Sequence, residues 1–190
     1  MNTKNLSATF VAVFSFFLLT GFFGDKPTPE EARKELQDMR QTTLNKLYQL
    51  HPSAKKEIQN AAGYAVFSNV GINLFVVSTA NGGGIAHDKK MGKDTYMKMF
   101  SGGVGIGMGV KDFRGVFIFT NSEAFNTFVN EGWQAGAQAD AAAKSDDKGD
   151  AYDEAIDVGP GVRLYQITES GLALQATIQG TKYWKDEDLN

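Results

Sequence analysis

Basic side chains are frequent in one predicted helix near the N-terminus and just after it. They are Arg33, Lys34, Arg40, Lys46, Lys55 and Lys56. Apolar side chains from Ala32 to Leu50 recur between them at three- and four-residue spacing and form one stripe. Such a helix can lay its stripe into a bilayer interface while its basic side chains meet anionic headgroups. The same stripe fits against a sheet, and acidic residues between Glu30 and Asp38 dilute the charge, so both roles stay open.

A second basic group lies in the segment HDKKMGKDTYMKM. Lys89, Lys90 and Lys93 share a glycine-containing loop with Met91. Lysines at a hairpin tip usually serve solubility, but three ammonium groups around an exposed methionine also suit a phosphate-bearing surface. Tyr183 and Trp184 lie between two lysines, where they suit either a headgroup belt or a core.

Catalytic and metal-binding chemistry find little support in the sequence. The chain has no cysteine, which excludes disulfides, thiol nucleophiles, cysteine zinc sites and iron–sulfur clusters. The two histidines, His51 and His87, lack metal-ligand spacing, and DDKGD at 146–150 lacks the EF-hand pattern. Ser101 does not lie in a G-x-S-x-G turn. We therefore expect a protein that is not an enzyme and carries no cofactor or metal.

Glycine occupies every second position of the segment GVGIGMG. In a strand, Gly103, Gly105, Gly107 and Gly109 would share one face, with apolar side chains on the other. A face without side chains indicates close approach by a packed helix, a crossing strand or an acyl chain. The segment matches neither glycine motif of a phosphate-binding loop.

Length and charge narrow the class further. A chain of 190 residues that is 42% hydrophobic fits one medium-sized domain. The net charge of −3 argues against a nucleic-acid-binding protein that acts through its overall charge. Contacts with anions must therefore be local.

Helix-capping residues, turn residues and the spacing of apolar residues predict an α+β fold. Thr28, Pro29 and Glu31 form a helix start with a capping box, and His51-Pro52 ends that helix, with a second helical piece from Ser53. We expect helices over 25–60, strands over 61–120, a helix over 121–132 capped by Thr120 and Glu123, an acidic loop over 133–160 and a C-terminal hairpin over 161–190 that turns at 169–171. The strands, short and bounded by glycine, predict a strongly twisted antiparallel sheet or a barrel-like meander.

Residues 1–24 have the pattern of a targeting segment. Lys4 precedes the continuous apolar run FVAVFSFFLLTGFF, and a polar, proline-containing stretch follows. This pattern predicts export to the periplasm or envelope, with an uncleaved N-terminal anchor as the alternative. LLTG at 18–21 looks like the start of a lipoprotein signal, but Phe22 stands where the acylated cysteine would be, so a lipoprotein is excluded.

Several blocks of the chain resemble the SYLF domain family. They are AAGYAVFSNVG (61–71), GGGIAHD (82–88), YMKMFSGGVGIGMGVKDFRGVFIF (96–119), FVNEGWQAGAQADAAAK (128–144) and the ending from 165 to 190. The resemblance covers nearly all of the chain after residue 24. It implies an α+β domain that binds phospholipids, phosphoinositides in the eukaryotic members, partly through an N-terminal amphipathic helix. The chain lacks the partner domains of the eukaryotic actin-patch adaptors, and an exported bacterial protein would not meet actin, so only a general role with anionic lipid carries over.

The sequence thus predicts a non-enzymatic lipid-binding protein of the bacterial envelope, with anionic phospholipid or a membrane surface as partner and no nucleic acid. The lysines and arginines named above are the candidate lipid-binding residues. One alternative is a structural or assembly protein that associates with itself or with other envelope proteins. Another is a carrier that encloses an acyl chain.

Overall fold

A computed structural model describes residues 27–69, 82–101, 114–134, 155–168, 171–172 and 181–190. Three helices and nine strands lie within these residues. The helices are α1 (Pro29–Leu50), α2 (Ala54–Asn60) and α3 (Ser122–Glu131). The strands are β1 (Gly63–Ser68), β2 (Gly82–Asp88), β3 (Lys93–Ser101), β4 (Arg114–Phe119), β5 (Trp133–Gln134), β6 (Ile156–Gly159), β7 (Val162–Thr168), β8 (Gly171–Leu172) and β9 (Thr181–Lys185).

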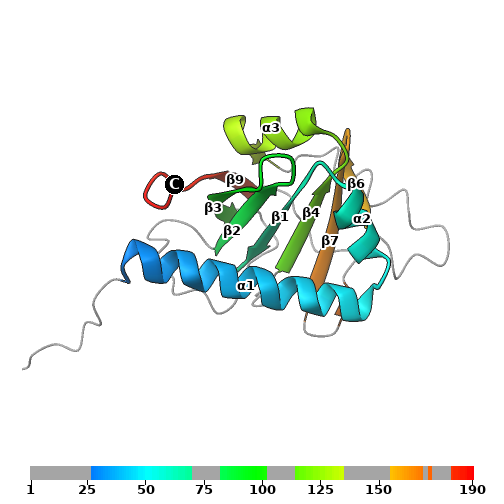
Figure 1. The fold of residues 1–190 in the computed structure, drawn as a ribbon, viewed down its shortest axis with the longest axis horizontal. Helices are drawn as coiled ribbons and strands as arrows, with labels where there is room; N and C mark the ends of the chain where they lie inside the picture. Colours follow the sequence, from blue (N-terminus) through cyan, green and yellow to red (C-terminus); the bar gives the residue numbers. More distant parts are fainter. Residues whose placement is uncertain (1–26, 70–81, 102–113, 135–154, 169–170, 173–180) are drawn as a thin grey trace, which may run out of the picture.

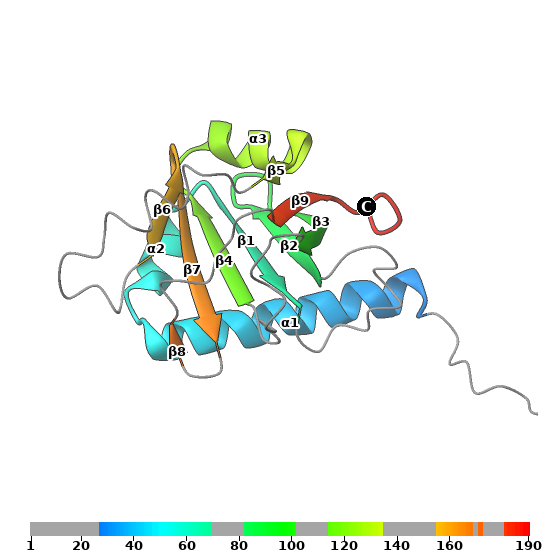
Figure 2. The ribbon, with the colours of Figure 1, turned by 180° about the vertical axis from the view of Figure 1, so that it is seen from behind.

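All strand pairs are antiparallel and belong to one curled sheet, in the order β5-β9-β3-β2-β1-β4-β7-β6, with β8 paired to β7. The predicted α+β fold with a twisted, barrel-like antiparallel sheet is confirmed. β1 is central: β2 and β3 follow it on one side, and β4 and β7 extend the sheet on the other. Figure 1 shows α1 and α2 on one side of the sheet and α3 on the other, and Figure 2 shows the same layers from behind.

Alternation along the strands produces two apolar layers. On the α3 face, Phe67, Phe117 and Tyr183 pack with Phe128 of α3 in an aromatic core. On the opposite face, Val66, Val116 and Ile118 pack under Leu44 and Leu47 of α1. A third cluster, Ala32, Leu36, Ile85, Tyr96 and Leu189, lies beneath the N-terminal half of α1. The sheet is therefore buried on both faces.

The predicted start of α1 is confirmed in detail. The Thr28 hydroxyl accepts a hydrogen bond from the Glu31 N–H at 3.3 Å, and the Glu31 carboxylate accepts one from the Thr28 N–H at 2.8 Å. The Thr28 hydroxyl also donates to the Glu31 carboxylate, at 3.0 Å. The bonds that this carboxylate accepts from Thr28 lower the pKa of Glu31, the bond from the N–H more than the bond from the hydroxyl. His51 ends the helix, and α2 begins after Ser53.

Three predictions about the second half of the chain need correction. The N-cap of α3 is Asn121 rather than Thr120: its Oδ1 accepts from the Ala124 N–H at 2.8 Å, while the Thr120 N–H donates to the Gly161 carbonyl. The hairpin over 161–190 forms only in part. β7 turns back into β8, but β9 pairs with β3 and β5 at the other end of the sheet. The loop predicted over 133–160 carries β5 and β6 at its ends, and 135–154 lie outside the described residues.

Candidate functional site

The arginines of α1 bind other parts of the protein. The Arg33 Nε donates to the Leu189 carbonyl at 2.9 Å, and its guanidinium lies 6.0 Å from the centre of the Tyr96 ring. The Arg40 Nη1 lies 2.8 Å from the Asp94 Oδ1 on β3, and both side chains are about one-fifth to one-quarter exposed. Both arginines therefore fix α1 to the sheet and to the residues after β9.

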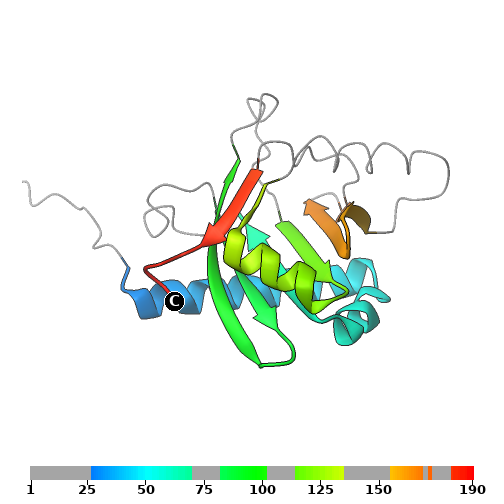
Figure 3. The same cartoon turned by 90° about the horizontal axis from the view of Figure 1, so that it is seen from above.

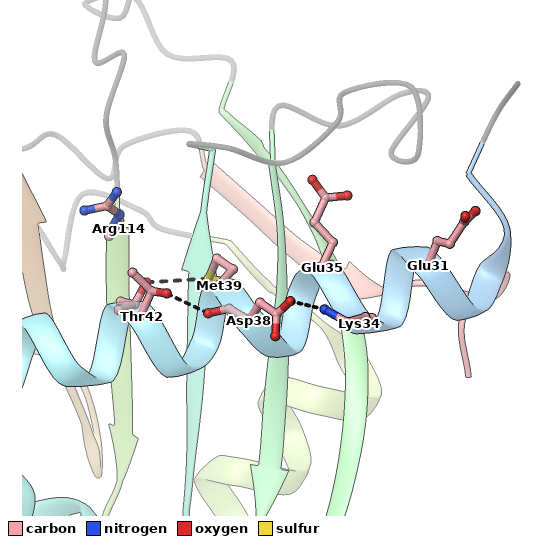
Figure 4. Close-up of a pocket in the computed structure, with 8 residues that line it drawn as sticks. Glu31, Lys34, Glu35, Asp38, Met39, Thr42 and Arg114 are labelled. Atoms are coloured by element: carbon pink, nitrogen blue, oxygen red, sulfur yellow. Dashed lines mark hydrogen bonds and ion pairs between the residues drawn. The ribbon is translucent and has the colours of Figure 1, made fainter. Parts of the chain in front are cut away.

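The lysines of α1 lie among acidic neighbours. The Lys34 Nζ is 2.6 Å from the Asp38 Oδ2, and the hydrogen bond and charge of Asp38 raise the pKa of Lys34. Lys46 is half-buried and also has an interaction partner. A groove of about 430 Å³ lies along this face, between α1 and Arg114 at the start of β4. Figure 4 shows the side chains that line it. Because Glu31, Glu35 and Asp38 line it with Lys34 and Arg114, the groove has more acidic than basic side chains.

The apolar stripe of α1 packs against the sheet, which was one of the two roles left open for it. Ala32, Leu36, Thr43 and Leu47 are buried, and Met39 is half-buried. Leu50, in the last turn, is 38% exposed. A membrane contact through the stripe would require α1 to leave the sheet.

The lysines of α2 and of the β2–β3 hairpin lie at one end of the sheet. The Lys89 Nζ donates to the carbonyls of Ile58, at 2.9 Å, and Gln59, in the last turn of α2. The Lys89 N–H also donates to the Ala62 carbonyl at 3.2 Å. In Figure 3 the hairpin projects at the bottom of the view, with α2 to its right. We call this region the α2–hairpin surface; its residues are Lys55, Lys56, Lys89, Lys90, Met91 and Lys93.

Most of this surface is free to meet a ligand. Lys55, Lys56, Lys90 and Lys93 are exposed, and their ammonium groups have no hydrogen bond or ion pair among the described residues. Met91, at the hairpin tip, is 68% exposed. The Asp88 Oδ1 accepts from the N–H groups of Lys90 and Met91 at 2.8 and 2.9 Å, which fixes the turn that presents this methionine.

Acidic residues near the α2–hairpin surface are held by groups from elsewhere. Glu57 of α2 accepts from Arg163 at 2.5 Å and from the Tyr165 hydroxyl at 2.7 Å, both on β7. Asp94 is shared by Arg40 and by the Nδ1 of His87, at 2.6 Å. Arginines thus neutralise Glu57 and Asp94, and Asp88 is the third carboxylate near this surface. The positive charge of the lysines is therefore in excess here.

Sequence reasoning missed the polar cluster formed by Arg40, Asp94 and His87. The Tyr64 ring packs on His87 with ring centres 5.2 Å apart, and burial raises the pKa values of Tyr64 and of Tyr48 on α1. These residues come from three separate segments, so spacing along the chain carries no signal for them. The cluster anchors α1 over β1–β3.

The C-terminal aromatics complete cores. Tyr183 is 1% exposed, lies in the aromatic core and has a raised pKa because of burial. Trp184 packs against the cluster around Leu189. Tyr183 is therefore not available for headgroups, whereas Trp184 is half-buried.

Two predicted features lie outside the part of the chain that the structure describes. The glycine face at 103, 105, 107 and 109 and the segment 1–24 lie outside the described residues. Within the described ranges, no three histidine, aspartate or glutamate side chains are placed to hold a metal ion. In the same part of the chain, no helix is long and apolar enough to cross a membrane.

Comparison with known proteins adds one relative. No family model matches the sequence. A protein of Aeromonas veronii described as "Beta cell expansion factor A" is 38% identical over 162 residues. The alignment covers 85% of this chain but 60% of that relative, so the chain spans less than two-thirds of the relative's length.

Proposed function

We propose that this protein is a non-enzymatic lipid-binding protein of the bacterial envelope that binds anionic phospholipid through the α2–hairpin surface. The observation that carries the proposal is the group of exposed lysines without partners around Met91, itself 68% exposed. The resemblance to SYLF domains supports the same class of ligand.

The geometry suits a peripheral contact. Each lysine near an anionic bilayer contributes about 1 kcal/mol, and the contribution falls with distance over a Debye length. Met91 extends beyond the last residues of β2 and the first of β3, so it can enter the interfacial region while Lys90 and Lys93 meet phosphates. α1 stays docked on the sheet in this arrangement, because its stripe is already buried.

Vesicle sedimentation with the full chain tests the proposal. Vesicles of phosphatidylcholine with and without phosphatidylglycerol are compared at low and high salt. We expect phosphatidylglycerol to increase the bound fraction at low salt only. The double variant Lys90→Gln/Lys93→Gln should bind the anionic vesicles roughly 25-fold more weakly, because each lysine accounts for about fivefold.

A matched control removes two other exposed lysines. Lys34→Gln/Lys182→Gln makes the same change in net charge away from the α2–hairpin surface, and its binding should stay within about threefold of the parent chain. Equal binding of both double variants, or no response to phosphatidylglycerol, would contradict the proposal.

A second candidate function comes from the alternative of assembly. Phe100 is 40% exposed on β3, where it pairs with Lys182 of β9, and it offers an apolar contact to another protein. Light scattering on lipid-free protein distinguishes this function from lipid binding. A stable oligomer favours assembly if Phe100→Ser dissociates it and if it does not bind vesicles.

The similarity to the Aeromonas protein supports one further proposal. The name of that relative attributes expansion of beta cells to it, and 38% identity makes a shared activity testable. Purified protein added to cultured beta cells should raise their number if the aligned 162 residues are sufficient.

A further inference from the structure

A second cavity lies on the opposite side of the sheet from α1. It has a volume of about 310 Å³ and lies between the N-terminal half of α3 and the turn that joins β6 to β7. The lining residues that matter here are Glu123, Phe128, Trp133, Pro160 and Val162. This volume is at the lower end of the range for small-molecule sites.

The walls of this cavity are fixed by two glycines in left-handed conformations. Gly132, with φ of +76°, brings the chain from α3 into β5, and a Cβ there would lie 2.7 Å from the Tyr183 carbonyl oxygen. Gly161, with φ of +72°, packs against Asn121, and its carbonyl accepts from the Thr120 N–H at 2.9 Å. Other residues would be strained at both positions, so the cavity is preorganised.

Trp133 provides an aromatic wall. Its ring packs on those of Phe117, Phe128 and Tyr183, with centres 5.5, 6.3 and 5.8 Å away. The indole is only partly buried by them and also lines the cavity. A tryptophan face attracts cations through its ring quadrupole, more strongly where water is excluded.

Glu123 makes the cavity electrostatically one-sided. It is exposed and has no hydrogen bond or ion pair within the described part of the chain. No lysine, arginine or histidine is among the residues that line the cavity. The Asn121 Oδ1 accepts from the Ala124 N–H and caps the N-terminus of α3. The Glu123 carboxylate is therefore the one full charge among the residues that line the cavity.

We propose that this cavity binds a small organic cation of the quaternary ammonium type, such as a choline group. Apolar walls of Pro160 and Val162 suit methyl groups, Trp133 suits the delocalised positive charge, and Glu123 balances it. The same chemistry occurs in free choline and in a choline lipid headgroup. The proposal does not depend on binding at the α2–hairpin surface, since different elements form the two sites.

The test uses the full chain and follows tryptophan indole resonances by NMR during titration with choline chloride. The chain has two tryptophans, and Trp133→Phe identifies the relevant signal. We expect a saturable shift of the Trp133 indole with a millimolar Kd, no saturation with ammonium chloride, and at least fivefold weaker binding in Glu123→Gln. Glu131→Gln, at the other end of α3, is the matched control and should bind choline normally.

Vesicles distinguish the two sources of the cation. The ligand is the lipid headgroup if the protein is retained on phosphatidylcholine vesicles but not on phosphatidylethanolamine vesicles. This retention should be lost in Glu123→Gln and reversed by free choline. The ligand is a free cation if the protein binds free choline but is not retained on phosphatidylcholine vesicles. A linear shift without saturation, equal choline affinity in Glu123→Gln, or tighter binding of ammonium or a lysine analogue would overturn the proposal.

Discussion

α1 and the α2–hairpin surface are both rich in basic residues, but they use them differently. Arg33 and Arg40 bind the Leu189 carbonyl and Asp94, and Lys34 binds Asp38. Lys90 and Lys93 have no such partners among the described residues. The number of basic residues in a segment is therefore a weak guide to its role, because the neighbours that folding provides decide whether a charge remains available.

The largest effect on stability is expected from the apolar stripe of α1, which docks the helix on the sheet. Leu47→Ala should lower the free energy of unfolding by about 3 kcal/mol, because Leu47 is fully buried between α1 and the sheet. Leu50→Ala should cost about 0.5 kcal/mol or less, since Leu50 is partly exposed. Urea unfolding followed by circular dichroism measures both. Similar losses would show that α1 is not docked as described.

The second prediction concerns the residues after β9, which help to hold α1. Asp186 is buried and lies 2.9 Å from the Lys98 Nζ. Burial lowers the pKa of Lys98, but hydrogen bonds and charge from Asp186 and Asp188 more than offset it, so the net pKa is raised. Asp186→Asn should cost about 2 kcal/mol at neutral pH.

This cost should depend on pH in a defined direction. A raised lysine pKa stabilises the folded state below the ordinary value of 10.5, and that contribution is lost as the pH rises through the folded value. The difference in unfolding free energy between the parent chain and Asp186→Asn should therefore shrink above pH 10.5. A constant difference from pH 7 to 11 would contradict the ion pair.

A third, smaller effect distinguishes Lys89 from its exposed neighbours. Lys89→Met removes the ammonium that binds the carbonyls of Ile58 and Gln59, and should cost about 1 kcal/mol. Lys90→Gln should leave stability unchanged while weakening vesicle binding. Thermal unfolding measures the structural role of Lys89, and vesicle sedimentation measures the binding role of Lys90. Equal losses of stability in the two variants would contradict this difference between the two lysines.

The smallest effect lies between adjacent residues of α1. Arg33→Gln should lower the unfolding free energy by about 0.5–1 kcal/mol, because it loses the bond to the Leu189 carbonyl. Lys34→Gln loses an exposed ion pair with Asp38, which solvent screens, so it should change the unfolding free energy less than Arg33→Gln does. Chemical denaturation of the two variants in parallel compares their unfolding free energies. A larger loss in Lys34→Gln than in Arg33→Gln would contradict the bond from Arg33 to the Leu189 carbonyl.

Local features of the fold were predictable from sequence, whereas long-range ones were not. The capping box at Thr28 and the end of α1 at His51 depend on residues within one turn, and both were found. The N-cap of α3 was misplaced by one residue because Thr120 and Asn121 both suit that position. The position of β9 between β3 and β5 depends on contacts across the whole chain, which periodicity does not encode.

The candidate site shows the same division. The hairpin lysines and Met91 were identifiable because a short polar turn with glycine predicts exposure. The bond from Lys89 to α2, which joins two basic segments into one surface, spans about 30 residues and needed the structure. The cavity beside Trp133 also escaped detection, because its lining comes from α3, β5 and the β6–β7 turn.

The location of β9 has a consequence for biogenesis. Residues 181–185 fill the position between β5 and β3, and Leu189 completes the cluster under α1, so a nascent chain cannot finish this sheet until residue 185 has been synthesised. Until then the outer edge of β3 has unpaired backbone groups, which are prone to pair with other chains. A chaperone that shields this edge before the last strand arrives would therefore be expected to raise the yield of folded protein.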